Sequence, residues 1–383
     1  MSTDLTPLVN GDVIRLAIDN YASKPKDEKK KSKGKILMAL VGFGVGALAG
    51  LGYMYRKMNH KVMPVANLDG NGNAFLFSES PPVDLIARQI VNPEDDSGLK
   101  ITLFQYQACP FCTKVRAYLD FAGMSYDIVE VNPVTKKQVG WSIYKKVPTV
   151  IVKVKEGYQQ LNDSSMIISA MASYLRDKNQ DLLKIVKFYP IVEYNEDDGA
   201  KHSEIMNRYF LMFGDEEPTD RTKESIVEER RWRKWSDDVL MHTLSPNIYR
   251  TWDESVEAFK MFDKNGDWEH IFSYWERQLV IYVGATAMYM IGKRLKKRHN
   301  LLDDVRQSLY QEVSHFLKTV KSKGTPFLGG DLPNLADLAV YACIISIDGS
   351  VAFDDLMRNT ALAPWYTRMQ QVINSRRGKI VKM

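Results

Sequence analysis

The hydrophobic residues of this 383-residue chain follow three different patterns along its length. The first is a run without any charged side chain over residues 36–55, which reads ILMALVGFGVGALAGLGYMY. About twenty apolar residues match the thickness of hydrocarbon that a helix must cross in a bilayer. Tyr53 and Tyr55 stand at its end, where interfacial aromatic residues are common. The pattern predicts one transmembrane helix at 36–55, preceded by a basic tail over 1–35.

A cleaved signal peptide or a mitochondrial presequence is the alternative to an anchor. A tail of more than thirty residues before the run is too long for a signal peptide. Lysines crowd the segment from Lys24 to Lys35, and by the positive-inside rule they place the N-terminus in the cytosol. Free thiols later in the chain favour the opposite orientation, because the cytosol keeps thiols reduced. Both flanks are basic, so the topology stays open.

The second pattern is an alternation of strand-like and helical segments. After a stretch rich in Asn, Asp, Gly, Pro and Ser, which predicts a linker with little regular structure over 56–98, short apolar runs occur at 101–104, 126–131 and 147–152. Helical stretches follow the first of these runs and Asp163. The order β-α-β, then β, then helix is that of the thioredoxin fold. We therefore expect an α/β thioredoxin-like domain over 99–186.

The third pattern begins at about Lys187, where apolar residues recur at helical spacing, for example over 274–297 and 305–320. We expect an all-α domain over 187–383. Asn334 and Asp337 have the spacing of a helix N-cap with a reciprocating acidic group, which we interpret as structural.

Composition narrows the functional classes only slightly. Lys and Arg number 52 and Asp and Glu 47, and this net charge of +5 is too mild to predict binding to nucleic acid. Three cysteines in the whole chain do not fit a disulfide-stapled secreted domain. Two of them, Cys109 and Cys112, lie close together, and the expected chemistry centres on this pair.

Cys109 directly precedes the first helix of the thioredoxin-like domain, with Pro110 at the first helical position. Unpaired backbone N–H groups and the positive end of the helix dipole favour a thiolate there, and can lower a thiol pKa from about 8.5 to 7 or below. Cys112 lies one turn further along as the buried partner, and Phe111 keeps the site apolar. Tyr106 is placed to donate its hydroxyl to the sulfur or to a substrate oxygen.

The same spacing of two cysteines is also half of a zinc site. Zinc would need two more ligands, but Cys343 stands alone and the histidines show no paired spacing. We therefore expect no metal, and a nucleophilic or redox role for Cys109.

Two further features fit a pocket beside Cys109. Pro148 begins a strand after a loop, and a cis proline there would leave the backbone of Val147 free to pair with an extended peptide. Asp163 and Ser164 open a helix, with side-chain and backbone donors suited to a carboxylate. Together with the two cysteines, these features predict glutathione, clamped at Val147 and Pro148 and held at its γ-glutamyl end by Asp163 and Ser164.

These motifs resemble those of a known family, the membrane-associated prostaglandin E synthases of type 2. The similarity is carried by YQACPFCTKVRAYLDF at 106–121, VEVNP at 129–133, KVP at 146–148, LNDSS at 161–165, WRKWSDD at 232–238, SPNIYRT at 245–251 and PNLADLAVY at 333–341. It covers roughly residues 99–374, and the chain is much less alike over its N-terminal tail and over 252–276.

The resemblance implies a glutaredoxin-like domain followed by a glutathione-transferase-like helical domain, in a homodimer. It implies an isomerase that converts a prostaglandin endoperoxide (prostaglandin H2) to prostaglandin E2 through the thiol of Cys109. The family's site residues fall on Cys109, Tyr106, Phe111 and Cys112, and its glutathione contacts on Val147, Pro148, Asp163 and Ser164. Members also hold haem together with glutathione, in a form associated with breakdown of the endoperoxide, so haem is not required for isomerisation. We expect any haem iron to be ligated by the thiolate of bound glutathione.

The expected location is a single-pass membrane protein of the Golgi or another endomembrane, with the catalytic domain in the cytosol. A soluble form released by cleavage and a mitochondrial membrane are the alternatives. The basic segment 293–299 could face haem propionates, the substrate carboxylate or the membrane surface, and a plain solvated face is the simplest interpretation. Arg294 and Arg298, four residues apart, are the preferred pair for a carboxylate.

Two other functions stay open beside the isomerase. One is a glutaredoxin-like thiol–disulfide oxidoreductase, in which Cys112 resolves the mixed disulfide. The other is a protein that binds glutathione and haem, either without turnover or as an endoperoxide lyase.

Overall fold

The computed structural model describes residues 67–69, 71–83, 85–195, 201–212 and 221–381. They belong to one unit of the chain, Met63–Met383. The basic tail at 1–35 and the transmembrane helix predicted at 36–55 lie outside the described residues. No helix within the described ranges is long and apolar enough to cross a membrane.

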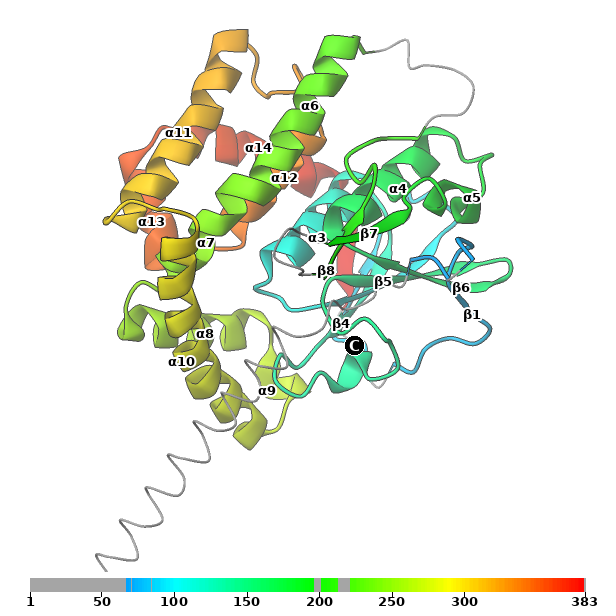
Figure 1. Cartoon of the computed structure of the whole chain (residues 1–383), viewed down its shortest axis with the longest axis horizontal. Helices are drawn as coiled ribbons and strands as arrows, with labels where there is room; N and C mark the ends of the chain where they lie inside the picture. The colour runs from blue at the N-terminus through cyan, green and yellow to red at the C-terminus, as the bar shows by residue number, and fades with distance from the viewer. Residues whose placement is uncertain (1–66, 70, 84, 196–200, 213–220, 382–383) are drawn as a thin grey trace, which may run out of the picture. The chain divides into compact units, whose positions relative to one another are not determined.

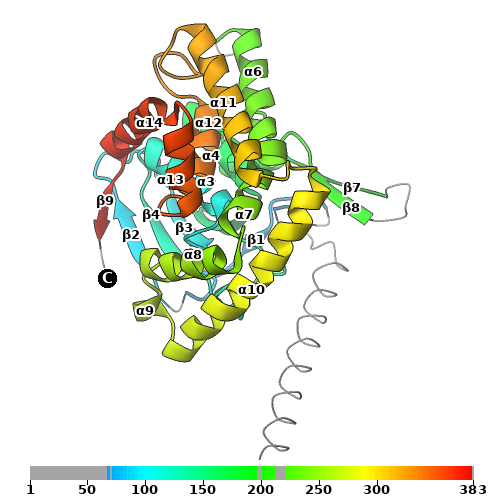
Figure 2. The same ribbon diagram turned by 90° about the vertical axis from the view of Figure 1, so that its left-hand side faces the viewer.

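Seven of the strands in this part of the chain form one mixed sheet, in the order β1-β6-β5-β3-β4-β2-β9 (Figures 1 and 2). Their bounds are β1 Leu76–Phe77, β2 Arg88–Val91, β3 Lys100–Gln105, β4 Tyr126–Glu130, β5 Thr149–Val154, β6 Gly157–Asn162 and β9 Lys379–Val381. β3 and β4 pair in parallel, and the other neighbours pair antiparallel. Parallel pairing needs a crossover connection, which the helix α3 (Pro110–Phe121) supplies.

The central strands are nearly continuous apolar runs because both faces of the sheet are covered. Alternate residues point to opposite faces, so Leu103 joins the main core whereas Phe104 joins a second, smaller cluster with Val129 and Ile151. The main core continues into α3 and into α4 (Ser164–Arg176), which follows β6. The thioredoxin-like order predicted for 99–186 is therefore present in the structure.

The sheet nevertheless extends beyond 99–186 at both ends. β1 and β2 lie inside the segment 56–98, so the prediction of little regular structure there is wrong for these residues. β2 has one fully buried residue, Ile90, and this is too short a signal to separate from a loop of similar composition. β9, from the end of the described chain, pairs with β2.

The second half is mostly helical, as expected. Its helices are α5 Leu182–Val186, α6 Lys223–Trp235, α7 Met241–Ile248, α8 Trp252–Asn265, α9 Trp268–Ile271, α10 Tyr274–Arg298, α11 Val305–Lys323, α12 Leu335–Ile345, α13 Val351–Asn359 and α14 Leu362–Arg376. A π-helical turn, η2 Ser236–Leu240, joins α6 to α7, and a 3₁₀ turn, η1 Lys137–Val139, lies between β4 and β5. The prediction of an all-α domain is wrong for the hairpin β7 (Ile191–Asn195) and β8 (Lys201–Ile205), and for β9.

α12 is the helix that joins the two halves, because it packs against both α3 and α6. Its residues from Ala336 to Ile344 are all buried. At its start the Asn334 side chain accepts the N–H groups of Ala336 (2.9 Å) and Asp337 (3.1 Å), and the Asp337 carboxylate accepts the Asn334 N–H (3.1 Å). The capping interpretation of this motif is confirmed.

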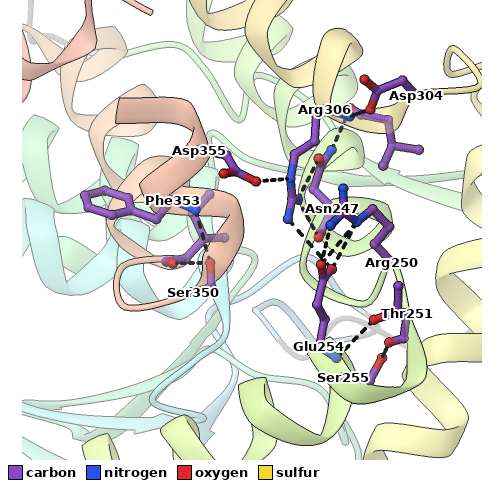
Figure 3. Close-up of polar contacts among 12 residues, drawn as sticks. Asn247, Arg250, Thr251, Glu254, Ser255, Asp304, Arg306, Ser350, Phe353 and Asp355 are labelled. Atoms are coloured by element: carbon purple, nitrogen blue, oxygen red, sulfur yellow. Dashed lines mark hydrogen bonds and ion pairs between the residues drawn. The ribbon is translucent and has the colours of Figure 1, made fainter. Parts of the chain in front are cut away.

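Figure 3 shows the polar cluster around Arg306, which fastens α7, α8, α11 and α13 together. The Arg306 guanidinium donates to the backbone oxygen (2.7 Å) and the side-chain oxygen (3.0 Å) of Asn247, and to Asp355 (3.0 Å). Glu254 lies 3.7 Å from the same guanidinium. Arg306 has little exposure, so its charge is neutralised by carboxylates inside the helical half.

Candidate functional site

Cys109 is the N-cap of α3, and Pro110 is the first residue of the helix. Proline suits this position because its missing N–H would have no partner in the first turn. The Cys109 N–H donates to the carbonyl of Tyr106 (3.0 Å), and the Thr113 N–H donates to the carbonyl of Cys109 (2.9 Å). Cys109 is half-buried, Cys112 is fully buried, and both are free thiols. The helix start predicted at Pro110 is confirmed.

A chain of hydrogen bonds runs through the two sulfurs. The thiol of Cys112 donates to the sulfur of Cys109, and this bond is the largest cause of the lowered pKa of Cys109. Burial opposes the effect, while the N–H groups of Cys112 and Phe111 and the charge of Arg116 reinforce it. Burial and the same thiol–thiol bond raise the pKa of Cys112 well above its ordinary value. Cys109 is therefore the more readily ionised thiol of the pair, and Cys112 is the less readily ionised one.

Arg116 supports the loop that carries Cys109. Its guanidinium donates to the side-chain oxygens of Gln105 (2.6 Å) and Gln107 (3.0 Å), to the Gln107 carbonyl (2.9 Å) and to the Thr113 hydroxyl (2.9 Å). Thr113 in turn donates to the carbonyl of Cys109 (3.1 Å). These acceptors are all uncharged, so the positive charge of Arg116 is left to act on the nearby thiolate.

A second buried network ties α3 to α4 and to η2. Lys114, which is almost fully buried, forms an ion pair with Asp237 and donates to the hydroxyl of Ser165 (2.8 Å). Asp237 also accepts the hydroxyls of Ser165 (2.6 Å) and Tyr209 (3.1 Å). Burial would raise the pKa of Asp237, but Lys114 and the two hydroxyls hold it below its ordinary value. This network fixes the amino end of α4 against the helix that carries the cysteines.

The loop before β5 contains the candidate clamp for a peptide. The Val147–Pro148 peptide bond is cis, as the sequence suggested, and β5 begins at the next residue. Val147 and Tyr106 both pack against the smaller core cluster on the outer face of the sheet. Burial, and then the charges of Cys109 and Cys112, raise the pKa of Tyr106, so its hydroxyl stays protonated near the sulfurs.

The amino end of α4 holds the other half of that candidate pocket. Asp163 is the N-cap of α4, and its carboxylate accepts the N–H groups of Ser165 (3.0 Å) and Met166 (2.9 Å). The remaining oxygen of Asp163 lies 3.6 Å from Arg208, a residue that follows β8. Ser164 is the first helical residue. The start of α4, the carboxylate of Asp163 and the guanidinium of Arg208 therefore lie close together. From the sequence, only Asp163 and Ser164 were expected here.

Two tyrosines that the sequence analysis missed also belong to the thiol environment. Burial is the main cause of the raised pKa of Tyr144, and the charges of Asp163 and Cys109 add to it. Burial and the charge of Cys109 likewise raise the pKa of Tyr249, at the end of α7. With Tyr106, three protonated phenols from three separate segments therefore lie within electrostatic range of Cys109. Tyr144 and Tyr249 lie far from the cysteines in the sequence, so no short motif could have indicated them.

The structure does not bring Arg294 and Arg298 into this group of residues. Both are exposed on the last turns of α10. Arg298 lowers the pKa of His242, after the larger effect of burial, so it lies close to that ring. His242 stacks on His299 with ring centroids 3.9 Å apart.

A cavity of about 510 Å³ lies on another side of α3. It reaches Gln107 and Ala108, immediately before Cys109, and is lined by the charged residues Arg88, Arg116, Asp120, Asp348 and Arg377. Apolar residues such as Ile128, Met261 and Phe262 line it as well, so the cavity offers both charged and apolar surface.

The thioredoxin-like sheet, the N-capping cysteine, the cis proline and the helical half packed on α3 define a protein of the glutathione-transferase type. Residues 103–181 match the family model for the glutathione S-transferase N-terminal domain. Glutathione transferase F7 from Populus trichocarpa is one of the similar solved structures, with a TM-score of 0.41 and 11% identity. The matched region covers 72% of this chain and 97% of the Populus trichocarpa chain.

Similarity to curated proteins is much higher. Prostaglandin E synthase 2 of Mus musculus is 45% identical over 279 residues, which are 72% of this chain and 71% of the relative. Prostaglandin E synthase 2 of Danio rerio is 44% identical over 278 residues, 72% of either chain. The chain therefore belongs to the prostaglandin E synthase 2 family.

Proposed function

We propose that this protein isomerises a prostaglandin endoperoxide to the β-hydroxyketone prostaglandin, with the thiolate of Cys109 as nucleophile. The observation that carries the proposal is the hydrogen-bonded pair of thiols at the start of α3. One sulfur is stabilised as a thiolate by its partner, by two N–H groups and by Arg116. Family membership, with relatives at 44–45% identity, supports the same reaction.

The chemistry needs no external oxidant or reductant. The Cys109 thiolate attacks one endoperoxide oxygen, so that an S–O bond forms, the weak O–O bond breaks and the other oxygen leaves as an alkoxide. A base then removes the proton from the carbon attached to the sulfur-bound oxygen. The C–H electrons form the ketone, the S–O bond breaks and the thiolate returns. The alkoxide takes up a proton to become the hydroxyl, so the product is an isomer of the substrate.

The three tyrosines give this reaction a source of hydrogen bonds to oxygen. Tyr106, Tyr144 and Tyr249 keep their protons at neutral pH, because burial and the negative sulfur both raise their pKa. A protonated phenol can donate to the alkoxide as it forms, which is the electrostatic stabilisation that such transition states require. Phe111, 38% exposed beside the thiolate, provides apolar surface for the ring system of the substrate.

Glutathione is the ligand that the neighbouring groups fit best. The backbone of Val147 before Pro148 suits the cysteinyl part of an extended tripeptide. The oxygen of Asp163 that takes no part in the helix cap suits the ammonium of the γ-glutamyl end, and the Ser164 N–H and Arg208, which lies 3.6 Å from that oxygen, suit its carboxylate. Bound there, glutathione would supply a second thiol beside Cys109.

The remaining expectations follow from the resemblance and belong to the same proposal. They are a homodimer, an anchor at 36–55 in an endomembrane such as the Golgi with the catalytic domain in the cytosol, and haem as a second ligand. Arg294 and Arg298 are the candidates for a carboxylate of haem or substrate, because both present an exposed guanidinium.

The test uses the whole purified chain, free of haem, with prostaglandin endoperoxide and a reducing thiol. Products are identified for the wild type, Cys109→Ser and Cys112→Ser. We expect the ketone prostaglandin from the wild type, none above buffer from Cys109→Ser, and ketone from Cys112→Ser, whose hydroxyl still donates to Cys109. A wild type that yields no more ketone than buffer would remove the isomerase proposal.

Thiol–disulfide exchange is the second candidate, favoured by the hydrogen bond between the two thiols. Exchange needs Cys112 to resolve the mixed disulfide, whereas isomerisation does not. Loss of activity in both cysteine variants, measured as reduction of a protein disulfide, would therefore indicate the exchange reaction.

A further inference from the structure

A row of exposed apolar side chains runs along α10. The exposed fractions are 78% for Trp275, 47% for Leu279, 49% for Tyr282, 39% for Val283 and 51% for Met290. Steps of three, four and seven residues put these side chains on one face of the helix. At 1.5 Å per residue, the row is about 22 Å long. A continuous apolar surface of this kind is a mark of an interaction site.

The opposite face of α10 accounts for its packing in the fold. Val280, Ile281 and Ala285 are buried there, and the helix packs on α8 and α7. At Gly284 a Cβ atom would lie 2.4 Å from the ring of Phe259 on α8, so the two helices approach closely on that side. In Figure 2, α10 runs along the margin of the ribbon with α8 on one side of it. The exposed row therefore takes no part in packing α10 against the rest of the fold.

The charge on α10 decides which partner fits the row. The same face continues into Lys293 and Lys297, both exposed. The helix has one carboxylate, Glu276, and this is already paired with Lys137 at 3.7 Å. In a contact with a second copy, the ammonium groups would find no carboxylate on this helix. Anionic lipids carry phosphate and carboxylate groups with which these ammonium groups can pair.

We propose that this face of α10 lies in the headgroup region of an anionic bilayer. We call it the α10 face and define it by Trp275, Leu279, Tyr282, Val283, Met290, Lys293 and Lys297. Tryptophan and tyrosine favour the boundary between headgroups and acyl chains, and lysines beside an apolar row are typical of helices that lie in that boundary. The proposal rests on the helix surface and holds whether or not the proposed isomerase activity does.

A short segment joins the predicted anchor to the described residues. Between Tyr55, the end of the predicted transmembrane run, and Asn67, the first described residue, the chain has eleven residues. Fully extended, they reach at most about 40 Å. Glu276 near the start of α10 lies 3.7 Å from Lys137, in the segment between β4 and β5 that leads to Val147 and Pro148. A bilayer touching the α10 face would therefore lie on the side of the molecule where that segment is found.

The experiment reconstitutes the whole chain in vesicles whose phosphatidylcholine and phosphatidylserine carry brominated acyl chains, which quench tryptophan fluorescence on contact. We expect stronger quenching in the wild type than in Trp275→Phe, and an increase of this difference with the phosphatidylserine fraction. Leu279→Glu with Tyr282→Glu is expected to abolish the difference. Lys293→Ala with Lys297→Ala is expected to move it to higher phosphatidylserine fractions.

Two controls make the result specific. Trp252→Phe removes a tryptophan on α8 that is 42% exposed. The difference in quenching caused by Trp275→Phe should be the same with and without this change. The circular dichroism spectrum and the rate of Cys109 alkylation report whether each variant is folded. Equal quenching of the wild type and Trp275→Phe would overturn the proposal. Concentration-dependent shielding of Trp275 from acrylamide in detergent, without lipid, would overturn it in favour of a second copy.

Discussion

Two arginines with several hydrogen bonds each, Arg116 on α3 and Arg306 on α11, have opposite kinds of partner. Arg306 is neutralised by Asp355 and Glu254, and it also donates to Asn247. The hydrogen-bond partners of Arg116 are amide, carbonyl and hydroxyl oxygens, which carry no charge. The carboxylates therefore neutralise the charge of Arg306, whereas the charge of Arg116 acts on the sulfur of Cys109.

The carboxylate nearest to the Arg116 network shows how this difference arises. Glu130 is fully buried and accepts the Gln107 N–H (2.5 Å) and the Gln105 side-chain amide (3.1 Å), so it reaches Arg116 through the two glutamines. Burial is the main cause of the raised pKa of Glu130. In the helical half the charged residues hold helices together, whereas beside Cys109 the charge of Arg116 favours ionisation of the thiol.

The largest effect on this comparison is expected from Arg306→Met. The change removes the buried partner of Asp355 and Glu254, which keep only the more exposed Arg358 and Arg250, and it leaves the Asn247 oxygens without the guanidinium donor. Breaking a buried ion pair costs about 3–5 kcal/mol of unfolding free energy, and the remaining pairs place the expected loss at the lower end of that range. Urea unfolding should show this loss, while the alkylation rate of Cys109 in the folded protein should stay as in the wild type. A loss below about 1 kcal/mol would contradict the structural role assigned to this cluster.

A smaller but chemical effect is expected from Cys112→Ala. It removes the largest cause of the lowered pKa of Cys109, so that pKa should rise. Alkylation follows the thiolate, so its half-maximal rate should move to higher pH, whereas Cys112→Ser should keep it near the wild-type pH. Burial raises the pKa of Cys343 to about 12, so that thiol should contribute little to the measured rate.

Arg116→Met should move the same pH profile in the same direction, but less far, because Arg116 is a lesser cause of the shift. Arg116→Lys keeps the charge and should keep most of the wild-type profile, even though it loses hydrogen bonds. Equal shifts in both variants would mean that Arg116 acts through the loop geometry alone.

Arg358→Met provides the smallest effect and a matched control for Arg306. Arg358 pairs with the same Asp355 (2.7 Å) but is 67% exposed. Exposed ion pairs contribute about 0–1 kcal/mol, so urea unfolding should change by no more than that. A loss as large as that of Arg306→Met would show that Asp355, rather than the buried arginine, controls the stability of the cluster.

Much of the fold could be predicted because local patterns coincide with the final contacts. The β-α-β order, the helix start at Pro110 and the cap at Asn334 each depend on residues adjacent in sequence. β2 and β9 could not be predicted, because both are short strands: β9 exists through pairing with β2, and β2 through pairing with β9 and β4.

The candidate site divides in the same way. Cys109, Cys112 and the Val147–Pro148 bond are visible as short motifs. Arg116, Lys114 and Arg208 act through partners that are brought to them by the fold, so their roles could not be found in the sequence.

The pairing of β9 with β2 has a consequence for how the chain is made. Gln89, Ile90 and Val91 pair with Val381, Ile380 and Lys379, so an outer strand of the sheet comes from the last residues described. A ribosome that has finished the cysteine-bearing segment still has to make the entire helical half before this edge can close. Synthesis from the amino end therefore cannot complete the seven-stranded sheet before the helical half has been made.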